Sequence, residues 1–130
     1  MPPEPIPSET EAIAKAIVDS AIHVHKALGP GLLESVYEAC LCHEFGKRRL
    51  RFKRQIGIPV VYDSIKIDSG LRLDLLVEDV IIVELKAVEH MLALYQAQLL
   101  TYLKLSGKRV GLLINFNVPV LKDGIKRVAL

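Results

Sequence analysis

Two neighbouring apolar segments that carry charged residues constrain the fold of this chain most. Residues 71–77 read LRLDLLV, residues 80–86 read VIIVELK, and only two acidic residues separate them. Two β-rich segments joined by so short a turn predict a β-hairpin, and the apolar content of the second predicts a central, largely buried strand. Asp74, Glu84 and Lys86 lie within these segments, and burying an unpaired charge is costly. We therefore expect each of the three to have a partner or a chemical task.

The alternation of side chains along a strand brings these charges together. Glu84 and Lys86 project from one face, and in simple hairpin register Asp74 lies beside Glu84 on the neighbouring strand. Adjacent carboxylates raise each other's pKa unless a cation lies between them. A hard ion such as Mg²⁺ suits the pair, because it is held by one or two carboxylates together with waters and phosphate oxygens. With Lys86 to orient or activate a water, the set predicts a metal-assisted phosphodiester-cleaving site.

The same residues resemble a nuclease signature. Asp74, nine intervening residues and then Glu84-Leu85-Lys86 are similar to the PD-(D/E)XK pattern, in which the first strand supplies Asp and the second supplies Glu-x-Lys. Residues 31–37, GLLESVY, resemble the motif of the GxxExxY family, a small bacterial and archaeal family of that superfamily. The resemblance extends from about residue 13 to residue 128. One departure is Tyr95, where that family is expected to have His.

This resemblance implies the members of the site. Asp74 and Glu84 would hold Mg²⁺ (or Mn²⁺), and Glu34 would join them directly or through water. Lys86 would act on the attacking water. Gln98 and Tyr102 resemble a Q-x-x-x-Y element that some nucleases of the superfamily place beside the metal. The expected catalytic residues are thus Glu34, Asp74, Glu84, Lys86 and Gln98, with Tyr37 and Tyr102 as supporting residues.

Several of these residues also have a purely structural interpretation. Spacing alone explains Glu34 as an acid in the first turn of a helix, where the helix dipole favours it. Tyr102 lies on an apolar stripe that is typical of a core, and Tyr37 lies on the expected inner face of the second helix together with Leu33, Val36, Cys40, Leu41 and Phe45. Gln98 on such a stripe needs a hydrogen-bond partner, which a carboxylate, a water or a phosphate would supply. Glu38, one turn after Glu34, is expected at the surface.

A dense group of cations follows the second expected helix. Six of the eight residues at positions 47–54 are Lys or Arg, although the net charge of the whole chain is only +2. The group could grip phosphates through Arg48, Arg51, Lys53 and Arg54. The alternative is a solvated helix end whose cations interact favourably with the dipole.

Length and composition limit the remaining possibilities. A chain of 130 residues predicts one domain, here residues 9–130, after a disordered Pro-rich tail at residues 1–8. We expect no membrane segment, because no apolar run reaches the roughly 18–20 residues that a span requires. Cys40 and Cys42, two apart on a helix, cannot bridge each other, so we expect a reduced, cytoplasmic protein. The hydrophobic content of 51% fits a buried sheet and leaves room for a homodimer interface.

The expected order of elements defines the fold. Helices at 9–28, 32–49 and 89–106 and strands at 55–62, 65–67, 71–77, 80–86, 110–114 and 125–130 predict an α/β protein. Its mixed central sheet is flanked by helices, as in the restriction-endonuclease-like core that the resemblance implies.

Three functions compete for this fold. The first is a Mg²⁺-dependent nuclease, acting on DNA in preference to RNA. The second is a non-catalytic module that binds nucleic acid or protein on a nuclease scaffold. The third is a structural dimer in which Arg72 pairs with Asp74 and Lys86 with Glu84.

Overall fold

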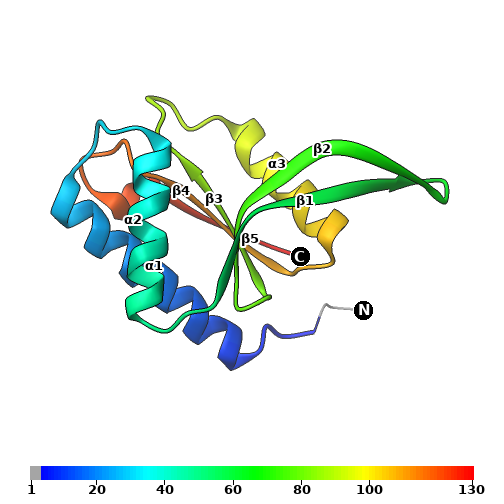
Figure 1. Ribbon diagram of the computed structural model, residues 1–130, viewed down its shortest axis with the longest axis horizontal. Coiled ribbons are helices and arrows are strands. Elements are labelled where there is room, and N and C mark those ends of the chain that lie inside the picture. The colour runs from blue at the N-terminus through cyan, green and yellow to red at the C-terminus, as the bar shows by residue number, and fades with distance from the viewer. Residues whose placement is uncertain (1–3) are drawn as a thin grey trace.

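The computed structural model describes residues 4–130 and confirms the expected α/β fold with a mixed sheet. Within these residues three helices surround one five-stranded sheet, consistent with a restriction-endonuclease-like core (Figure 1). The elements, in chain order, are α1 (Ser8–Leu28), α2 (Glu34–Lys47), β1 (Phe52–Tyr62), β2 (Ile65–Val77), β3 (Ile81–Lys86), α3 (Ala93–Ser106), β4 (Val110–Asn115), the 3-10 turn η1 (Leu121–Gly124) and β5 (Ile125–Ala129).

The sheet follows the order of the chain, β1-β2-β3-β4-β5. Only β3 and β4 pair in parallel, with Ile81 opposite Val110 and Lys86 opposite Asn115. The crossover through α3 connects them, as the strand–helix–strand order predicts. β1 is an edge strand, where Pro59 costs no ladder hydrogen bond.

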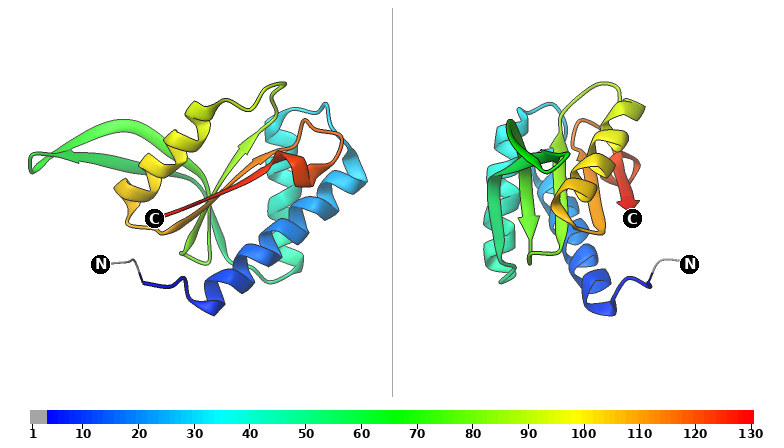
Figure 2. Two further views of the ribbon diagram at one scale, coloured as in Figure 1. Left: turned by 180° about the vertical axis from the view of Figure 1, so that it is seen from behind. Right: turned by 90° about the vertical axis from the view of Figure 1, so that its right-hand side faces the viewer.

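Helices cover both faces of the sheet, as the right-hand view of Figure 2 shows. Alternate residues of β3 divide between the two cores. Ile81, Val83 and Leu85 pack with α1 and α2, whereas Ile82 packs with Leu99 and Leu103 of α3. The near-continuous apolar sequence of β3 is explained by this burial on both sides. Glu84 and Lys86 interrupt it on the α3 face.

The largest difference between the expected and the observed elements is in β2. The sequence predicts two strands separated at Ser69-Gly70, but the structure has one strand of 13 residues. The register between β1 and β2 shifts between Ile58 and Val60, and the Ser69 hydroxyl donates to the carbonyl of Ile58. Gly70 has a φ of +68°. The residues expected to end the strand therefore form an irregularity within it, of the kind that β-bulges produce.

Two helix boundaries and one helix face also differ. α3 begins at Ala93 rather than at residue 89, and α2 begins at Glu34 rather than at residue 32. Leu33 and Val36, expected on the inner face of the second helix, are exposed. Tyr37, Leu41 and Phe45 form the buried apolar stripe of α2, as expected.

The β1–β2 hairpin extends beyond the rest of the sheet as a free two-stranded arm (Figure 1). β2 pairs with β3 only from Leu75 to Val77, whereas its pairing with β1 continues to the Asp63-Ser64 turn. Both turn residues have positive φ, which suits a tight hairpin turn. Large apolar side chains are exposed near the tip of the arm, namely Val61, Tyr62, Ile65 and Ile67.

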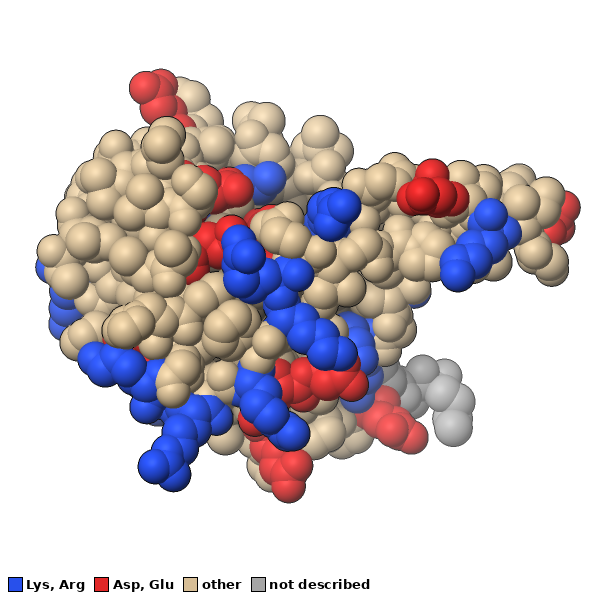
Figure 3. Space-filling view, viewed as in Figure 1, with Lys and Arg blue, Asp and Glu red and all other residues tan. Residues whose placement is uncertain are grey.

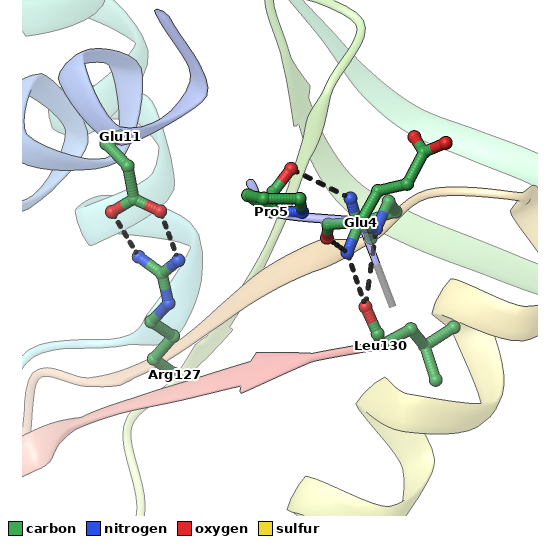
Figure 4. A network of polar contacts seen from close by, with 6 residues as sticks. Glu4, Pro5, Glu11, Arg127 and Leu130 are labelled. Carbon is green, nitrogen blue, oxygen red and sulfur yellow. Dashed lines mark hydrogen bonds and ion pairs between the residues drawn. The ribbon is translucent and has the colours of Figure 1, made fainter. Parts of the chain in front are cut away.

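The two ends of the described chain meet beside β4 and β5. The Arg109 guanidinium donates to the carbonyls of Glu4, Pro5 and Leu130. Figure 4 labels Glu4, Pro5 and Leu130 and shows the Arg127–Glu11 ion pair, in which an Nη1···Oε2 contact of 3.0 Å joins β5 to α1. Of the expected disordered tail, residues 1–3 lie outside the described residues, residues 4–7 precede the helix, and Ser8 already belongs to α1. Among residues 4–130, every helix is too short or too polar to cross a membrane.

Substitution of Gly124 tests the packing around β4, and substitution of Gly46 serves as the comparison. A Cβ added at Gly124 would collide with the carbonyl oxygen of Asn115, whereas one added at Gly46 in α2 would meet no atom within 4 Å. We expect Gly124→Ala to lower the free energy of unfolding by about 1–3 kcal/mol. Gly46→Ala should raise it by about 0.5–1 kcal/mol, because Ala is the better helix former. Urea denaturation measures both, and equal midpoints for the two variants would contradict this packing.

Candidate active site at the fork between β2 and β3

Asp74 and Glu84 lie where β2 and β3 separate. The last paired residues are Leu75 and Val83, and beyond them side chains replace the strand ladder. The main-chain N–H of Asp74 donates to Glu84 Oε1 at 3.0 Å, and the N–H of Leu85 donates to Asp74 Oδ2 at 2.9 Å. The two carboxyl groups therefore face each other across the fork, as the hairpin register predicts. Each uses one oxygen as a main-chain acceptor and has a second oxygen for another partner.

The fork accumulates negative charge that the protein does not fully compensate. Glu84 is only 8% exposed, and burial followed by the charge of Asp74 raises its pKa to about 8. Burial also raises the pKa of Asp74, against the opposing effect of the Leu85 N–H. Two acids that resist ionisation together form a site for a proton or for a cation.

Lys86 is near this pair but makes no ion pair within residues 4–130. Its charge counts among the influences that lower the pKa values of Asp74 and Glu84. Its Nζ lies over the ring of Tyr95, 4.5 Å from the centroid. Tyr95, which stands where the resemblance predicts His, thus contacts Lys86, the lysine of the Glu-x-Lys signature.

The two ion pairs of the structural-dimer hypothesis are not present in the described chain. Arg72 is exposed and donates to the carbonyl of Gln55 at 3.3 Å, not to Asp74. Lys86 contacts Tyr95 rather than Glu84. The strand charges are therefore not neutralised in the way that this hypothesis requires.

Glu34 and Glu38, on the first two turns of α2, add acids near the fork. Partial burial and the charge of Asp74 raise the pKa of Glu34, which Lys86 opposes. Glu38 was expected at the surface, but it is buried and accepts from Gln55 Nε2 at 3.1 Å and from Arg54 Nη2 at 3.4 Å. Its charge also contributes to the raised pKa of Asp74. Sequence reasoning missed Glu38, although its spacing of four residues from Glu34 places both acids on one helix face.

Tyr37 connects the site to the loop before α2. Its side chain is fully buried and stacks on Phe116, with ring centroids 4.5 Å apart. Its hydroxyl donates to the carbonyl of Gly29 at 2.6 Å and accepts from the N–H of Leu32 at 3.1 Å. Tyr37 thereby fixes the loop that leads into α2, and so the position of Glu34 at the start of that helix.

Tyr102 and Gln98 of α3 differ in their relation to the fork. Tyr102 is half-buried, and its pKa is raised by burial and by the charges of Glu84 and Asp74, so it borders the site. Gln98 is exposed, and within the described chain its side chain has no hydrogen bond to another residue. Gln98 lies on the same stripe of α3 as Tyr95 and Tyr102, three residues after the one and four residues before the other. A supporting role of Gln98 at the fork stays a prediction.

Figure 3 shows acidic side chains gathered in the centre of one face, bordered by basic ones. Most cations expected to bind nucleic acid are already paired with acids. Arg51 pairs with Glu78 at 2.9 Å, and Arg48 pairs with Glu44 at 3.1 Å. Arg54 pairs with Glu38, as described above. Lys53 is exposed and forms no ion pair within residues 4–130.

Comparison with known proteins assigns the family. The family profile of the PD-(D/E)XK nuclease superfamily matches residues 11–128. The chain belongs to the PD-(D/E)XK nuclease superfamily. No curated protein and no solved structure matches the chain significantly. Membership in the narrower GxxExxY family stays a prediction.

Members of the PD-(D/E)XK nuclease superfamily generally depend on divalent metals and act on nucleic acid. In residues 4–130 of this member, no group of three or more His, Cys, Asp or Glu side chains is arranged to hold a metal ion. The fork supplies two hard carboxylates, Asp74 and Glu84, and the role of Glu34 as a third ligand stays a prediction. The donor set fits Mg²⁺ or Mn²⁺, because such ions take one or two carboxylates and complete their shell with water and phosphate.

The raised pKa of Glu84 predicts how the stability of this superfamily member depends on pH. Between the ordinary value of 4.5 and about 8 the folded state holds a proton that the unfolded state has lost. The free energy of unfolding should therefore fall as pH rises through this range, by a few kcal/mol, and level off above it. Glu84→Gln should flatten this slope and raise stability at pH 8. Urea denaturation from pH 5 to pH 9 measures it, with the exposed Glu9→Gln as control; an unchanged slope in Glu84→Gln would refute the assignment.

The hydroxyl of Tyr37 provides a second test. Tyr37→Phe keeps the ring stacked on Phe116 but leaves the Gly29 carbonyl and the Leu32 N–H without this partner. We expect the free energy of unfolding to fall by about 1–3 kcal/mol. Tyr62→Phe, at an exposed position on the arm, should leave it unchanged. Thermal or urea unfolding of both variants is the measurement, and equal stability would show that the hydroxyl does not hold the loop.

Proposed function

We propose that this protein is a divalent-metal-dependent nuclease that hydrolyses phosphodiester bonds of DNA at the β2–β3 fork. The observation that carries the proposal is the pair of carboxyl groups at the fork. Asp74 and Glu84 face each other, both have raised pKa values, and Lys86 lies beside them without a carboxylate partner in the described chain. A structural ion-pair network would have neutralised these charges.

The residues of the fork divide the chemistry among them. Asp74 and Glu84 would hold Mg²⁺ or Mn²⁺, which when bound polarises the phosphate and lowers the pKa of a coordinated water. Glu34 would join them through a water, since it lies at the exposed start of α2. The Lys86 ammonium would orient the attacking water and offset the negative charge that develops on the phosphate. Tyr102 would border the phosphate, and Gln98, on the same stripe of α3, would support the site through a hydrogen bond to a water or to the phosphate.

The state of Glu84 makes the site responsive to its cation. At neutral pH without metal its carboxyl group keeps a proton, because ionisation beside Asp74 in a buried setting is unfavourable. A bound cation reverses this balance, so binding would release a proton and become tighter as pH rises. The fork would therefore take up metal most readily on the alkaline side of neutrality.

The finer features of the proposal concern partners and setting. The substrate is DNA rather than RNA, gripped in part by Lys53 and by the exposed guanidinium of Arg51. The chain is a GxxExxY-type enzyme, on the strength of the GLLESVY sequence. Cys40 and Cys42 are free thiols, which fits a cytoplasmic protein. A homodimer is the assembly that we favour, because large apolar side chains such as Leu33 and Leu94 are exposed.

Conservative variants of the fork test the proposal. Asp74→Asn and Glu84→Gln should each lower the rate of DNA cleavage by at least about a hundredfold. Asp19→Asn in α1, where the partly exposed carboxylate pairs with Lys15 and has no other ion pair among residues 4–130, should cut at the parental rate. The measurement is cleavage of single- and double-stranded DNA and of RNA with Mg²⁺, with Mn²⁺ and with EDTA. Since Glu84→Gln is expected to stabilise the fold, its loss of activity cannot be attributed to unfolding.

The outcomes separate the competing functions. Parental cleavage rates in Glu84→Gln would refute the proposed site. Nucleic-acid binding that survives EDTA, without any cleavage product under either metal, would favour a non-catalytic binding module. A rise in the thermal midpoint of the parent with Mn²⁺ at pH 8, absent in Asp74→Asn, would show independently of cleavage that the fork takes the cation.

A further inference from the structure

Lys86 occupies an unusual electrostatic position. It lies near enough to Glu34, Asp74 and Glu84 to influence the ionisation of each. A lysine among three acids would ordinarily form a salt bridge with one of them. Within residues 4–130 it forms none, and its Nζ instead lies over the ring of Tyr95, 4.5 Å from the centroid.

The ring that receives this ammonium is held in place by the fold. Tyr95 lies in the first turn of α3, where its main-chain N–H donates to the carbonyl of Leu92 at 3.0 Å. Its side chain is half-buried and packs with the cluster that contains Leu99 and Leu103. This packing holds the ring face that Lys86 contacts.

We propose that Tyr95 is a positioning residue for Lys86, holding its ammonium beside the fork by a cation–π contact and away from the carboxylates. The inference rests on the proposed function. The face of an aromatic ring attracts a cation without neutralising an acid. Both consequences matter for the fork: the oxygens of Asp74 and Glu84 remain available to a divalent ion, and the amine remains available to the attacking water.

Loss of the ring should therefore act on the chemical step. In Tyr95→Leu the ammonium loses its attractive surface and can approach the carboxylate pair. We expect kcat for DNA cleavage to fall about tenfold while KM changes less than about twofold. Tyr95→Phe keeps the ring face and should restore kcat to within about twofold of the parent. Tyr62→Leu, the same substitution at the exposed tip of the arm, is the matched control.

A spectroscopic measurement tests the contact without reference to cleavage. Protons next to Nζ of a lysine over an aromatic ring resonate upfield because of the ring current. In ¹³C-labelled protein the Lys86 Hε signals, assigned by their absence in Lys86→Arg, should be shifted upfield in the parent and in Tyr95→Phe. The shift should disappear in Tyr95→Leu and persist in Tyr62→Leu.

The two measurements distinguish failure of the contact from failure of the proposed function. Unshifted Lys86 signals in the parent, or an unchanged kcat in Tyr95→Leu, would overturn the positioning role. A change in KM alone, with kcat unchanged, would also overturn it. If the parent cuts no nucleic acid, the nuclease proposal fails and the catalytic meaning of the contact fails with it, while the NMR signals still show whether the ring holds the amine.

Discussion

The separation of β2 from β3 at Asp74 and Glu84 is the constraint on which the rest of the site depends. If β2 and β3 continued to pair, main-chain carbonyls would accept these N–H groups, and no side chain would fit between the two strands. Here two carboxylates accept the main-chain N–H groups of Asp74 and Leu85 instead. The acids are therefore part of the hydrogen bonding of the fold and of the candidate active site at once.

This dual role has an energetic consequence. Glu84 is buried, and its pKa of about 8 reflects a carboxyl group whose charged form the folded protein disfavours. Functional sites frequently hold groups whose ionisation is perturbed in this way. Such groups lower the stability of the folded protein. The surrounding structure compensates through the two apolar cores that sandwich β3. A cation that binds at the fork would relieve the same repulsion, so ligand binding and folding are thermodynamically linked.

The sequence predicts the features that local pattern determines. The alternation of charged and apolar residues gave the hairpin, the register that sets Asp74 beside Glu84, and the mixed sheet. It could not predict the burial of Glu38, because that depends on Arg54 and Gln55 approaching from β1.

Other misses have the same origin in packing. At Ser69-Gly70, where a break in β2 was expected, the strand continues, and its register with β1 shifts instead. The exposure of Leu33 and Val36 depends on which residues of α2 face the sheet, and periodicity alone leaves that choice open between adjacent stripes. The profile match over residues 11–128 identifies the superfamily, whereas individual roles depend on contacts between elements far apart in sequence.

The free arm has a mechanical consequence for the site at its base. From Asp74 to the turn at Ser64, β2 has only β1 as a neighbour in the sheet. These ten residues of extended chain span roughly 30 Å. At the base of the arm, Leu73, Ile56 and Ile58 still pack against α3, so the part of the arm that lacks support from the rest of the fold begins beyond Leu71. A load applied at the tip of the arm would thus act first on the contacts between β1 and α3, before it reached the two carboxyl groups.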